Sequence, residues 1–194
     1  MKSFFLRVLI SFVLILPFTT ARAATETYTL DPTHSYVMWH INHFGFSSPS
    51  GKWLAEGTLV LDESAPKNSK VNVTIPVTNM VTGIPKLDEH LQDGDFFDTA
   101  HYPNATFVSD KVNVTGKTTA KVQGILTVHG VSKPVTLEVT LNKMGESPIT
   151  HKKTVGFTAT TTIKRSDFGI SKYSPGLGDE VKINIETEAA LATG

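Results

Sequence analysis

The sequence predicts an all-β protein, an eight-stranded antiparallel barrel with a short helix on a long connection between two strands. Three observations support this fold class. Apolar and polar residues alternate with a period of two along most of the chain from Tyr36 to Leu191, which is typical of strands with one buried face. Turn-forming residues separate the alternating stretches. Several stretches are long, and closure into a barrel, rather than stacking as a sandwich, removes the exposed edges of long strands.

Residues 1–23 have the pattern of a secretory signal peptide. Two basic residues precede an apolar run at 8–18, and Ala21 and Ala23 are small residues that suit a cleavage site. The apolar run is well short of the ~20 residues that a helix needs to cross a bilayer, so an uncleaved membrane anchor is the less favoured interpretation. We expect cleavage after Ala23 and a single barrel domain at residues 24–194.

Eight alternating stretches follow the signal peptide, and each is interpreted as one strand. The alternation is strict in four of them, residues 71–77, 135–141, 155–163 and 181–185. It is looser in the other four, residues 34–43, 52–62, 104–109 and 117–129. Turn signals rich in glycine, proline, serine and asparagine lie between the stretches, at 49–51, 62–68, 116, 130, 145–148 and 174–178.

One segment on the connection between the third and fourth strands has helical spacing instead. Ile84, Leu87 and Leu91 recur at intervals of three and four residues, and Gly94 follows as a suitable stop. We predict a helix of one to two turns within residues 84–92.

Small residues occupy mid-strand positions on the apolar rows: Ala55, Gly57, Ala120, Gly124 and Ala159. The interior of an eight-stranded barrel is either filled by side chains or wide enough for one small ligand. If these rows face inward, the small residues leave room for an apolar ligand. Alternatively, Gly57 and Gly124 are bends that let the strands coil around a packed interior. The pattern alone leaves both interpretations open.

The composition and the absence of motifs exclude several functional classes. Eighteen basic and eighteen acidic residues give no net charge, so electrostatics do not support a nucleic-acid partner. The chain has no cysteine, which excludes disulfides, thiolate zinc sites and a cysteine nucleophile. His40 and His43 point to opposite faces of one strand, which disfavours a local metal site. No nucleophile elbow, zinc-protease helix or phosphate loop is present, so we expect neither a metal centre nor an enzyme.

Several segments of the mature chain resemble a known protein family. They are Leu-Asp-Pro-Thr-His-Ser at 30–35, Lys-Leu-Asp-Glu-His-Leu at 86–91, Asp-Phe-Phe-Asp at 95–98, Gly-Ile-Leu-Thr-Val-His-Gly-Val-Ser-Lys-Pro-Val at 124–135 and Lys-Arg-Ser-Asp-Phe-Gly at 164–169. In this order and spacing they resemble the YceI-like polyisoprenoid-binding proteins. The resemblance covers essentially all of the mature chain.

This resemblance implies a lipocalin-like eight-stranded antiparallel barrel exported to the bacterial periplasm. It implies a binding or carrier protein that holds an isoprenoid lipid, a prenyl diphosphate or a prenylated quinone, in an elongated apolar cavity. No cofactor is expected beyond that lipid. The resemblance therefore favours a real cavity, and it places the segment from Ile84 to Asp98 at the barrel mouth.

One residue departs from the family pattern. Many relatives carry arginine immediately before the Asp-x-His-Leu run, where this chain has Leu87. If that arginine helps to hold a charged head group, this chain has lost one phosphate contact, and a quinone head becomes more plausible. Alternatively, the arginine of the relatives is part of a structural salt bridge.

The apolar rows supply the candidate lining of the cavity: Trp39, Ile41, Trp53, Leu59, Val73, Ile75, Phe107, Leu126, Leu137, Phe157 and Ile185. The candidate polar residues of the mouth are His43, Asp88, His90 and Arg165. Arg165 is the single arginine after residue 23, and its planar guanidinium suits a diphosphate. For each of the four polar residues, a purely structural role is the alternative.

The expected partner is the isoprenoid ligand itself, and no nucleic acid is expected. Transient contact with a membrane or a lipid donor and pairing with a second copy of the chain are further candidate interactions. Two other functions remain as alternatives. A ligand-free stress-response barrel would have a filled interior. A metal- or haem-linked electron-transfer accessory would need several histidines to converge.

Overall fold

The computed structural model describes residues 25–192, and the predicted signal peptide lies outside the described residues. The strands are β1 (Glu26–Leu30), β2 (Tyr36–His43), β3 (Ser50–Leu54), β4 (Glu56–Leu61), β5 (Lys70–Pro76), β6 (Asn104–Val114), β7 (Thr119–Val128), β8 (Val131–Glu146), β9 (Lys153–Lys164) and β10 (Leu177–Leu191). The helices are α1 (Pro85–Gln92) and the short 3₁₀ turns η1 (Pro66–Asn68), η2 (Val77–Asn79) and η3 (Arg165–Phe168).

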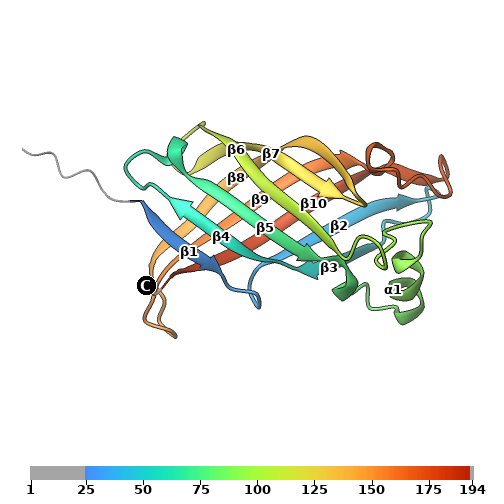
Figure 1. The fold of residues 1–194 in the computed structure, drawn as a ribbon, viewed down its shortest axis with the longest axis horizontal. Helices are drawn as coiled ribbons and strands as arrows, with labels where there is room; N and C mark the ends of the chain where they lie inside the picture. The colour runs from blue at the N-terminus through green and yellow to red at the C-terminus, as the bar shows by residue number, and fades with distance from the viewer. Residues whose placement is uncertain (1–24, 193–194) are drawn as a thin grey trace, which may run out of the picture.

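The strands form a closed antiparallel barrel. Pairing runs β1-β4-β5-β6-β7-β8-β9-β10, and β10 pairs back to β1, which closes the ring. Figure 1 shows an elongated barrel with α1 beside one end, while β1 begins and β10 ends at the other. The predicted eight-stranded antiparallel barrel with one short helix is confirmed.

Ten strand segments make an eight-stranded barrel because two of the eight strands are each divided into two segments: β1 with β2, and β3 with β4. The segments β1 and β2 both pair with β10, and Ala55 separates β3 from β4. Ser35 connects the two interrupted strands and β10 by hydrogen bonds. Its carbonyl accepts a hydrogen bond from the Ala55 amide at 2.8 Å, and its hydroxyl donates to the Glu188 carbonyl at 3.0 Å. Because Ser35 is fully buried, satisfying its polar groups within the protein avoids a large desolvation penalty.

Two β-bulges explain why some strands are longer than their sequence pattern predicts. The register shifts between Ser109 and Lys111 in β6 and between Leu141 and Lys143 in β8. An extra residue reverses the inward and outward alternation, so Leu141 and Met144 both line the interior although they are three residues apart. The apolar alternation therefore stops early along the sequence, while the strand continues to Glu146.

The helix α1 lies on the connection between β5 and β6, as predicted. Pro85 occupies its first turn, where a missing amide hydrogen has no consequence. Leu91 is buried and Leu87 packs beside the core, so the predicted apolar spacing faces the barrel. The helix ends at Gln92, and Asp93 rather than the predicted Gly94 is its C-terminal cap.

The two mid-strand glycines allow close packing of neighbouring strands. A Cβ on Gly57, whose φ is +157°, would collide with the carbonyl oxygen of Asn72 on β5. A Cβ on Gly124 would lie 2.5 Å from both the Phe107 ring and the Val108 carbonyl oxygen. Close approach of the neighbouring strand therefore requires glycine at both positions, and neither glycine lines the cavity, so the room inside the barrel comes from elsewhere.

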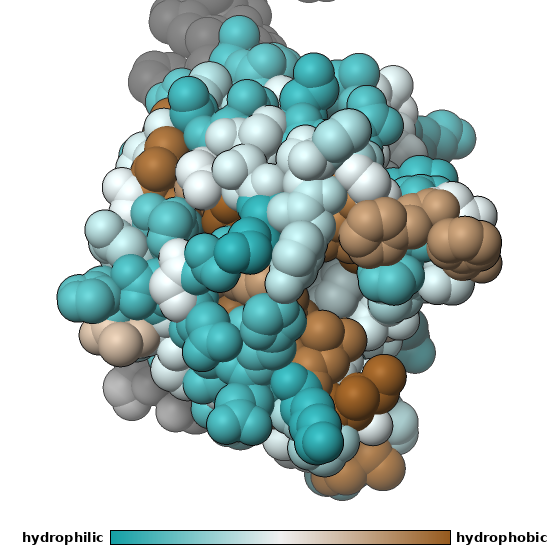
Figure 2. Space-filling model, turned by 90° about the vertical axis from the view of Figure 1, so that its right-hand side faces the viewer, coloured by the Kyte–Doolittle hydropathy of each residue, from teal (hydrophilic) through white to brown (hydrophobic). Residues whose placement is uncertain are grey.

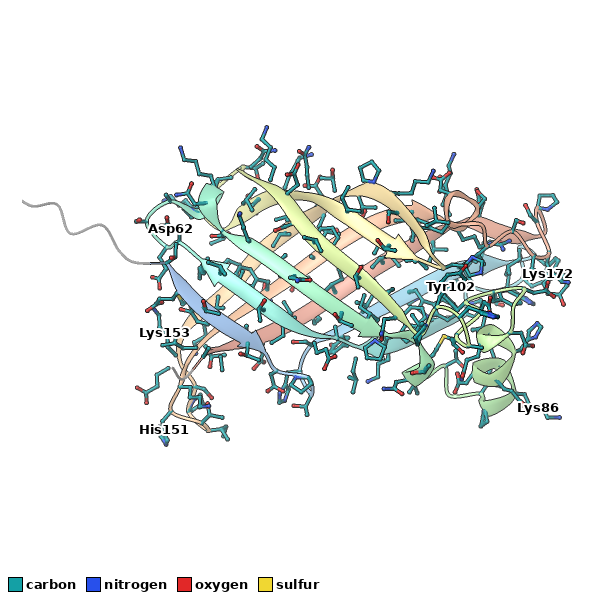
Figure 3. The ribbon with its side chains drawn as sticks, in the orientation of Figure 1. Asp62, Lys86, Tyr102, His151, Lys153 and Lys172 are labelled. Carbon is teal, nitrogen blue, oxygen red and sulfur yellow. The ribbon has the colours of Figure 1, made fainter. Side chains whose placement is uncertain are left out.

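At the end opposite α1, charged side chains tie strands together. Lys153 of β9 bonds both Glu26 of β1 and Glu63 in the loop after β4, and Figure 3 shows Lys153 at this end. The bond from Lys153 lowers the pKa of Glu26, and the two carboxylates raise the pKa of Lys153. Among the described residues, no helix has the length and hydropathy needed to cross a membrane.

Candidate functional site

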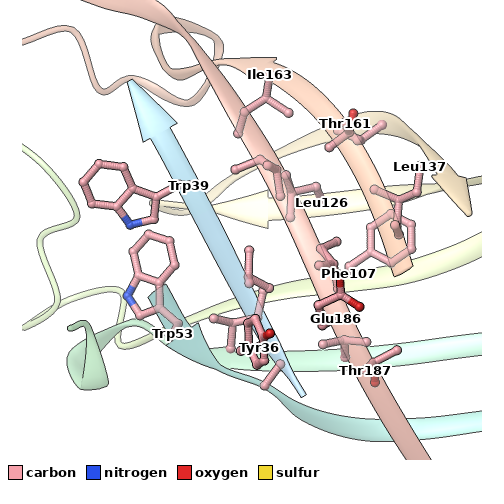
Figure 4. Close-up of a pocket in the computed structure, with 18 of the residues that line it drawn as sticks. Tyr36, Trp39, Trp53, Phe107, Leu126, Leu137, Thr161, Ile163, Glu186 and Thr187 are labelled. Carbon is pink, nitrogen blue, oxygen red and sulfur yellow. The ribbon is translucent and has the colours of Figure 1, made fainter. Parts of the chain in front are cut away.

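The barrel encloses a cavity of about 930 Å³ that runs along its interior. Side chains from all ten strand segments line it, and most of them are aliphatic or aromatic. Its volume lies near the upper end of the ~300–1,000 Å³ that is typical of small-molecule sites. Figure 4 shows one region of the wall, with the two tryptophans at one side and Phe107, Leu126 and Leu137 further along.

All the apolar residues singled out from the sequence lie on this wall. They are Trp39, Ile41, Trp53, Leu59, Val73, Ile75, Phe107, Leu126, Leu137, Phe157 and Ile185. The small residues Ala55, Ala105, Ala120 and Ala159 also line the cavity, whereas Gly57 and Gly124 are absent from its wall. Alanines therefore leave the interior open, because their side chains end far from the barrel axis.

The two tryptophans form a pair in the wall near α1. Their ring centroids lie 6.2 Å apart, and Trp53 also packs edge-on against Phe97 at 5.2 Å. The indole nitrogen of Trp53 donates to the Val77 carbonyl at 3.2 Å. The indole nitrogen of Trp39 is buried without a hydrogen-bond partner among the described residues. An unsatisfied buried donor in a cavity wall is a candidate contact for a ligand oxygen.

Aromatic side chains form a collar where α1 meets the barrel. The His90 ring packs edge-on against Phe96 at 4.9 Å, and Tyr173 lies 6.4 Å from His90 and 6.2 Å from Phe96. His43 packs edge-on against Phe44 at 4.8 Å. Both histidines line the cavity, so the structure places these two predicted mouth residues at the site.

The other two predicted mouth residues have structural partners. Asp88 does not line the cavity; its carboxylate accepts a hydrogen bond from the Thr82 amide at 2.8 Å and so holds the loop that leads into α1. The neighbouring Leu87 lines the cavity instead. A helix presents successive residues to different sides, so only one of the two reaches the interior.

Arg165 lies on the wall, but its guanidinium is bonded to the backbone. It donates to the carbonyls of Gly178 at 2.8 Å, Ile170 at 3.0 Å and Leu177 at 3.0 Å. Burial lowers the pKa of Arg165, and nearby Asp179 partly opposes this effect. The side chain ties η3 to the start of β10, so the structural role that the sequence left as an alternative is present, and three of the guanidinium N–H groups are already bonded to the backbone.

Within residues 25–192, no three histidine, aspartate or glutamate side chains lie close enough together to hold a metal ion. The seven histidines of the chain are distributed over several elements of the barrel. For example, His90 lies on α1, whereas His151 lies in the hairpin between β8 and β9 at the far end (Figure 3).

The model of the YceI-like domain matches residues 28–189, which is nearly the whole barrel. The chain belongs to the YceI-like family. A UPF0312 protein of Pseudomonas putida is 37% identical over 155 residues, covering 78% of this chain and 80% of that protein. A UPF0312 protein of Pseudomonas syringae is 36% identical over 160 residues, covering 81% of this chain and 83% of that protein.

Solved structures share the barrel. Burkholderia cenocepacia BcnA superposes with a TM-score of 0.74 at 26% identity, covering 84% of this chain and 99% of BcnA. The Campylobacter jejuni YCEI protein gives a TM-score of 0.71 at 30% identity, covering 78% and 90%. A polyisoprenoid binding domain from Saccharophagus degradans gives 0.65 at 15% identity, covering 85% and 98%, and this last likeness concerns the fold alone.

The segments that carry the YceI-like resemblance contribute to turns and also to the cavity wall, which Leu30, Leu126 and Val135 line. In the segment 30–35, Asp31 accepts hydrogen bonds from the Thr33 amide and hydroxyl and bonds His34 at 2.8 Å. These contacts lower the pKa of Asp31 to about 2, chiefly through His34, and the same bond raises the pKa of His34. The compact turn connects β1 to β2.

Sequence reasoning predicted the two histidines of the collar but missed the other aromatic residues at this end. Phe96 and Phe97 belong to the Asp-Phe-Phe-Asp segment, and Tyr173 lies on the loop before β10. A pair of aromatic residues in an otherwise polar connection is a local signal for the first two. Tyr173 carries no such signal, because only barrel closure brings its loop beside α1.

Proposed function

We propose that this YceI-like protein is a periplasmic, non-enzymatic carrier that holds an isoprenoid lipid inside its barrel. The observation that carries the proposal is the long cavity of about 930 Å³, whose wall is mostly aliphatic and aromatic. An unbranched or methyl-branched hydrocarbon chain suits such a space because it needs few polar contacts. The Saccharophagus degradans relative in fold, a polyisoprenoid binding domain, supports the same class of ligand.

Burial of hydrocarbon would supply most of the affinity. At ~25 cal/mol per Å², an isoprene unit burying roughly 100 Å² contributes about 2.5 kcal/mol. Association and ordering cost on the order of 4–15 kcal/mol. Several buried units therefore exceed that cost, and the head group orients the ligand more than it holds it.

A prenylated quinone fits this wall better than a prenyl diphosphate. The guanidinium of Arg165 already donates to three backbone carbonyls, and Leu87 stands where many family members have arginine. The indole N–H of Trp39 is a single neutral donor without a partner among the described residues, and a quinone oxygen would suit it if the ring turned this buried nitrogen toward the cavity. A buried donor left unsatisfied costs roughly 1–3 kcal/mol, so a bond from a ligand oxygen would remove that penalty.

The deciding experiment identifies what the protein carries. Protein purified from its own periplasm is examined by native mass spectrometry, and the bound material is extracted with organic solvent for lipid analysis. We expect an isoprenoid adduct, with a quinone as the main species. Delipidated protein is then offered a prenylated quinone and a prenyl diphosphate of equal chain length. An extract without isoprenoid, together with uptake of neither compound, would contradict the proposal.

A further inference from the structure

The end of the barrel that carries α1 exposes a group of apolar side chains. Phe44, Phe46, Val81, Ile84 and Tyr173 are each about half or more exposed, and Phe46 is 91% exposed. We call these five residues the apolar rim. Figure 2, which looks onto this end, shows brown side chains next to teal ones on the surface. Exposed apolar groups gathered in one place on a protein commonly mark an interaction surface.

The backbone holds the rim in place. The Phe44 amide donates to the Gly176 carbonyl at 3.1 Å, which joins the turn after β2 to the loop before β10. Phe46 donates to the His43 carbonyl at 2.9 Å, so the turn that presents Phe46 is closed. Val81 exchanges two backbone hydrogen bonds of 3.0 Å with Lys52 of β3. The exposure of these side chains is therefore a built feature of three separate segments.

The rim is continuous with the cavity. Phe44, Ile84 and Tyr173 are on the cavity wall as well as on the surface. An apolar molecule that meets the rim can therefore reach the interior along an apolar path. A second copy of the chain seated on the rim would instead cover this end of the cavity.

The charges around the rim select the kind of surface that it fits. Residues 79–103, which include α1, carry five acidic residues and one lysine. Lys172, beside Tyr173, is paired with Asp95 at 2.7 Å. Basic clusters are what draw proteins to anionic lipids, and the segment 79–103 has an acidic excess instead. An electrically neutral lipid surface is the partner that matches apolar tips with this charge.

We propose that the apolar rim docks the barrel onto a lipid bilayer by inserting Phe46, Ile84 and their neighbours among neutral headgroups. Docking in this position sets the cavity mouth against the bilayer, so that an isoprenoid passes between bilayer and barrel without crossing water. The second part of this proposal rests on the proposed carrier function, whereas docking itself does not.

Co-flotation with phosphatidylcholine vesicles tests docking directly. We expect the purified exported protein to float with the vesicles, and Phe46→Ser or Ile84→Ser to weaken partitioning about tenfold each through the lost burial of apolar area. Ile149→Ser is the matched control, because Ile149 is 85% exposed in the hairpin between β8 and β9 at the opposite end. Added salt and anionic lipid should leave the flotation of the wild type unchanged or lower it.

Docking would be overturned if the wild type did not float, if Ile149→Ser and Phe46→Ser lost flotation equally, or if flotation required anionic lipid. It would also be overturned if the protein bound no vesicles but sedimented as a dimer that Phe46→Ser abolished. The last result would assign the rim to a second copy. Lipid extraction from the same samples separates the two proposals. Flotation by protein that carries no isoprenoid would support docking and contradict the proposed carrier function. Bound isoprenoid in protein that does not float would support the carrier function and contradict docking.

Discussion

The indole of Trp39 lies across Gly51 on the neighbouring strand, where a Cβ would come within 2.7 Å of the Trp39 Cζ2 atom. The two residues face each other in the pairing of β2 with β3. The missing side chain of Gly51 thus decides where the tryptophan ring lies in the cavity wall. The same Cβ would lie 2.9 Å from the indole nitrogen of Trp39, which is buried without a hydrogen-bond partner among the described residues.

A methyl group at Gly51 should displace the indole. We expect Gly51→Ala to lower the free energy of unfolding by about 1–3 kcal/mol through overpacking and to change the tryptophan fluorescence. Gly94→Ala is the control, because a Cβ there meets nothing within 4 Å. Denaturant unfolding followed by fluorescence measures both variants, and equal stability of Gly51→Ala and wild type would show that the ring moves freely.

Ala159 is the position for closing the cavity. Its side chain lines the wall, so Ala159→Phe should fill the space and reduce isoprenoid content severalfold while the barrel stays folded. Lipid extraction with circular dichroism of the same sample is the measurement. Normal lipid content in a folded Ala159→Phe protein would place the ligand elsewhere.

Gly124→Leu should behave differently from Ala159→Phe. A side chain at Gly124 meets the Phe107 ring and the Val108 carbonyl oxygen, each at 2.5 Å from the Cβ position, and the backbone oxygen cannot move aside without breaking pairing. We expect a loss of stability, on the order of 3 kcal/mol or more, rather than a specific loss of ligand. Thermal unfolding distinguishes these outcomes, and a stable variant that lacks only lipid would contradict the expectation.

Arg165→Lys tests the structural role of the Arg165 guanidinium. Lysine cannot reproduce three hydrogen bonds in a fixed plane, so at least one of the carbonyls of Gly178, Ile170 and Leu177 loses its donor. We expect a loss of about 1–3 kcal/mol in unfolding free energy, with similar weakening for a quinone and a diphosphate of equal tail. Quenching of tryptophan fluorescence measures both affinities. A selective loss of the diphosphate would restore Arg165 as a head-group contact.

The Asp31–His34 pair should titrate with opposite signs. Bonds from His34 and Thr33 lower the pKa of Asp31 to about 2, so its stabilising effect is present above the ordinary carboxyl pKa and is lost as the pH falls from about 4 to about 2. The pKa of His34 is raised by Asp31, so its contribution is present below its ordinary value of 6.5 and is lost as the pH rises through the raised value. NMR titration should find the raised pKa in the wild type and a return toward 6.5 in Asp31→Asn. An unchanged pKa of His34 in Asp31→Asn would contradict the hydrogen bond from Asp31 as the cause of the raised pKa.

We expect the signal peptide to be removed when the protein is exported. Protein recovered from the periplasm should begin at Ala24, because Ala21 and Ala23 are the small residues of a cleavage site. N-terminal sequencing decides this, and a chain that begins at Met1 in the periplasmic fraction would contradict cleavage.

The local pattern of the sequence was enough for the fold class and for the apolar wall. Alternation with period two marks one face of each strand, and in this barrel the apolar face turns inward. For this reason all eleven apolar candidates, from Trp39 to Ile185, lie on the cavity wall. The spacing of Leu87 and Leu91 likewise predicted α1, since a helix needs only neighbours along the chain.

The tertiary structure decided whatever depends on residues far apart in the sequence. Some contacts arise only when strands from different parts of the chain become neighbours. These are the hydrogen bonds of Arg165, the packing of Trp39 on Gly51 and the approach of Tyr173 to His90. Bulges in β6 and β8 shift the alternation by one residue, which no pattern of period two can anticipate. The size of the cavity belongs to the same class, because it depends on how far side chains from opposite walls reach toward the axis once the barrel has closed.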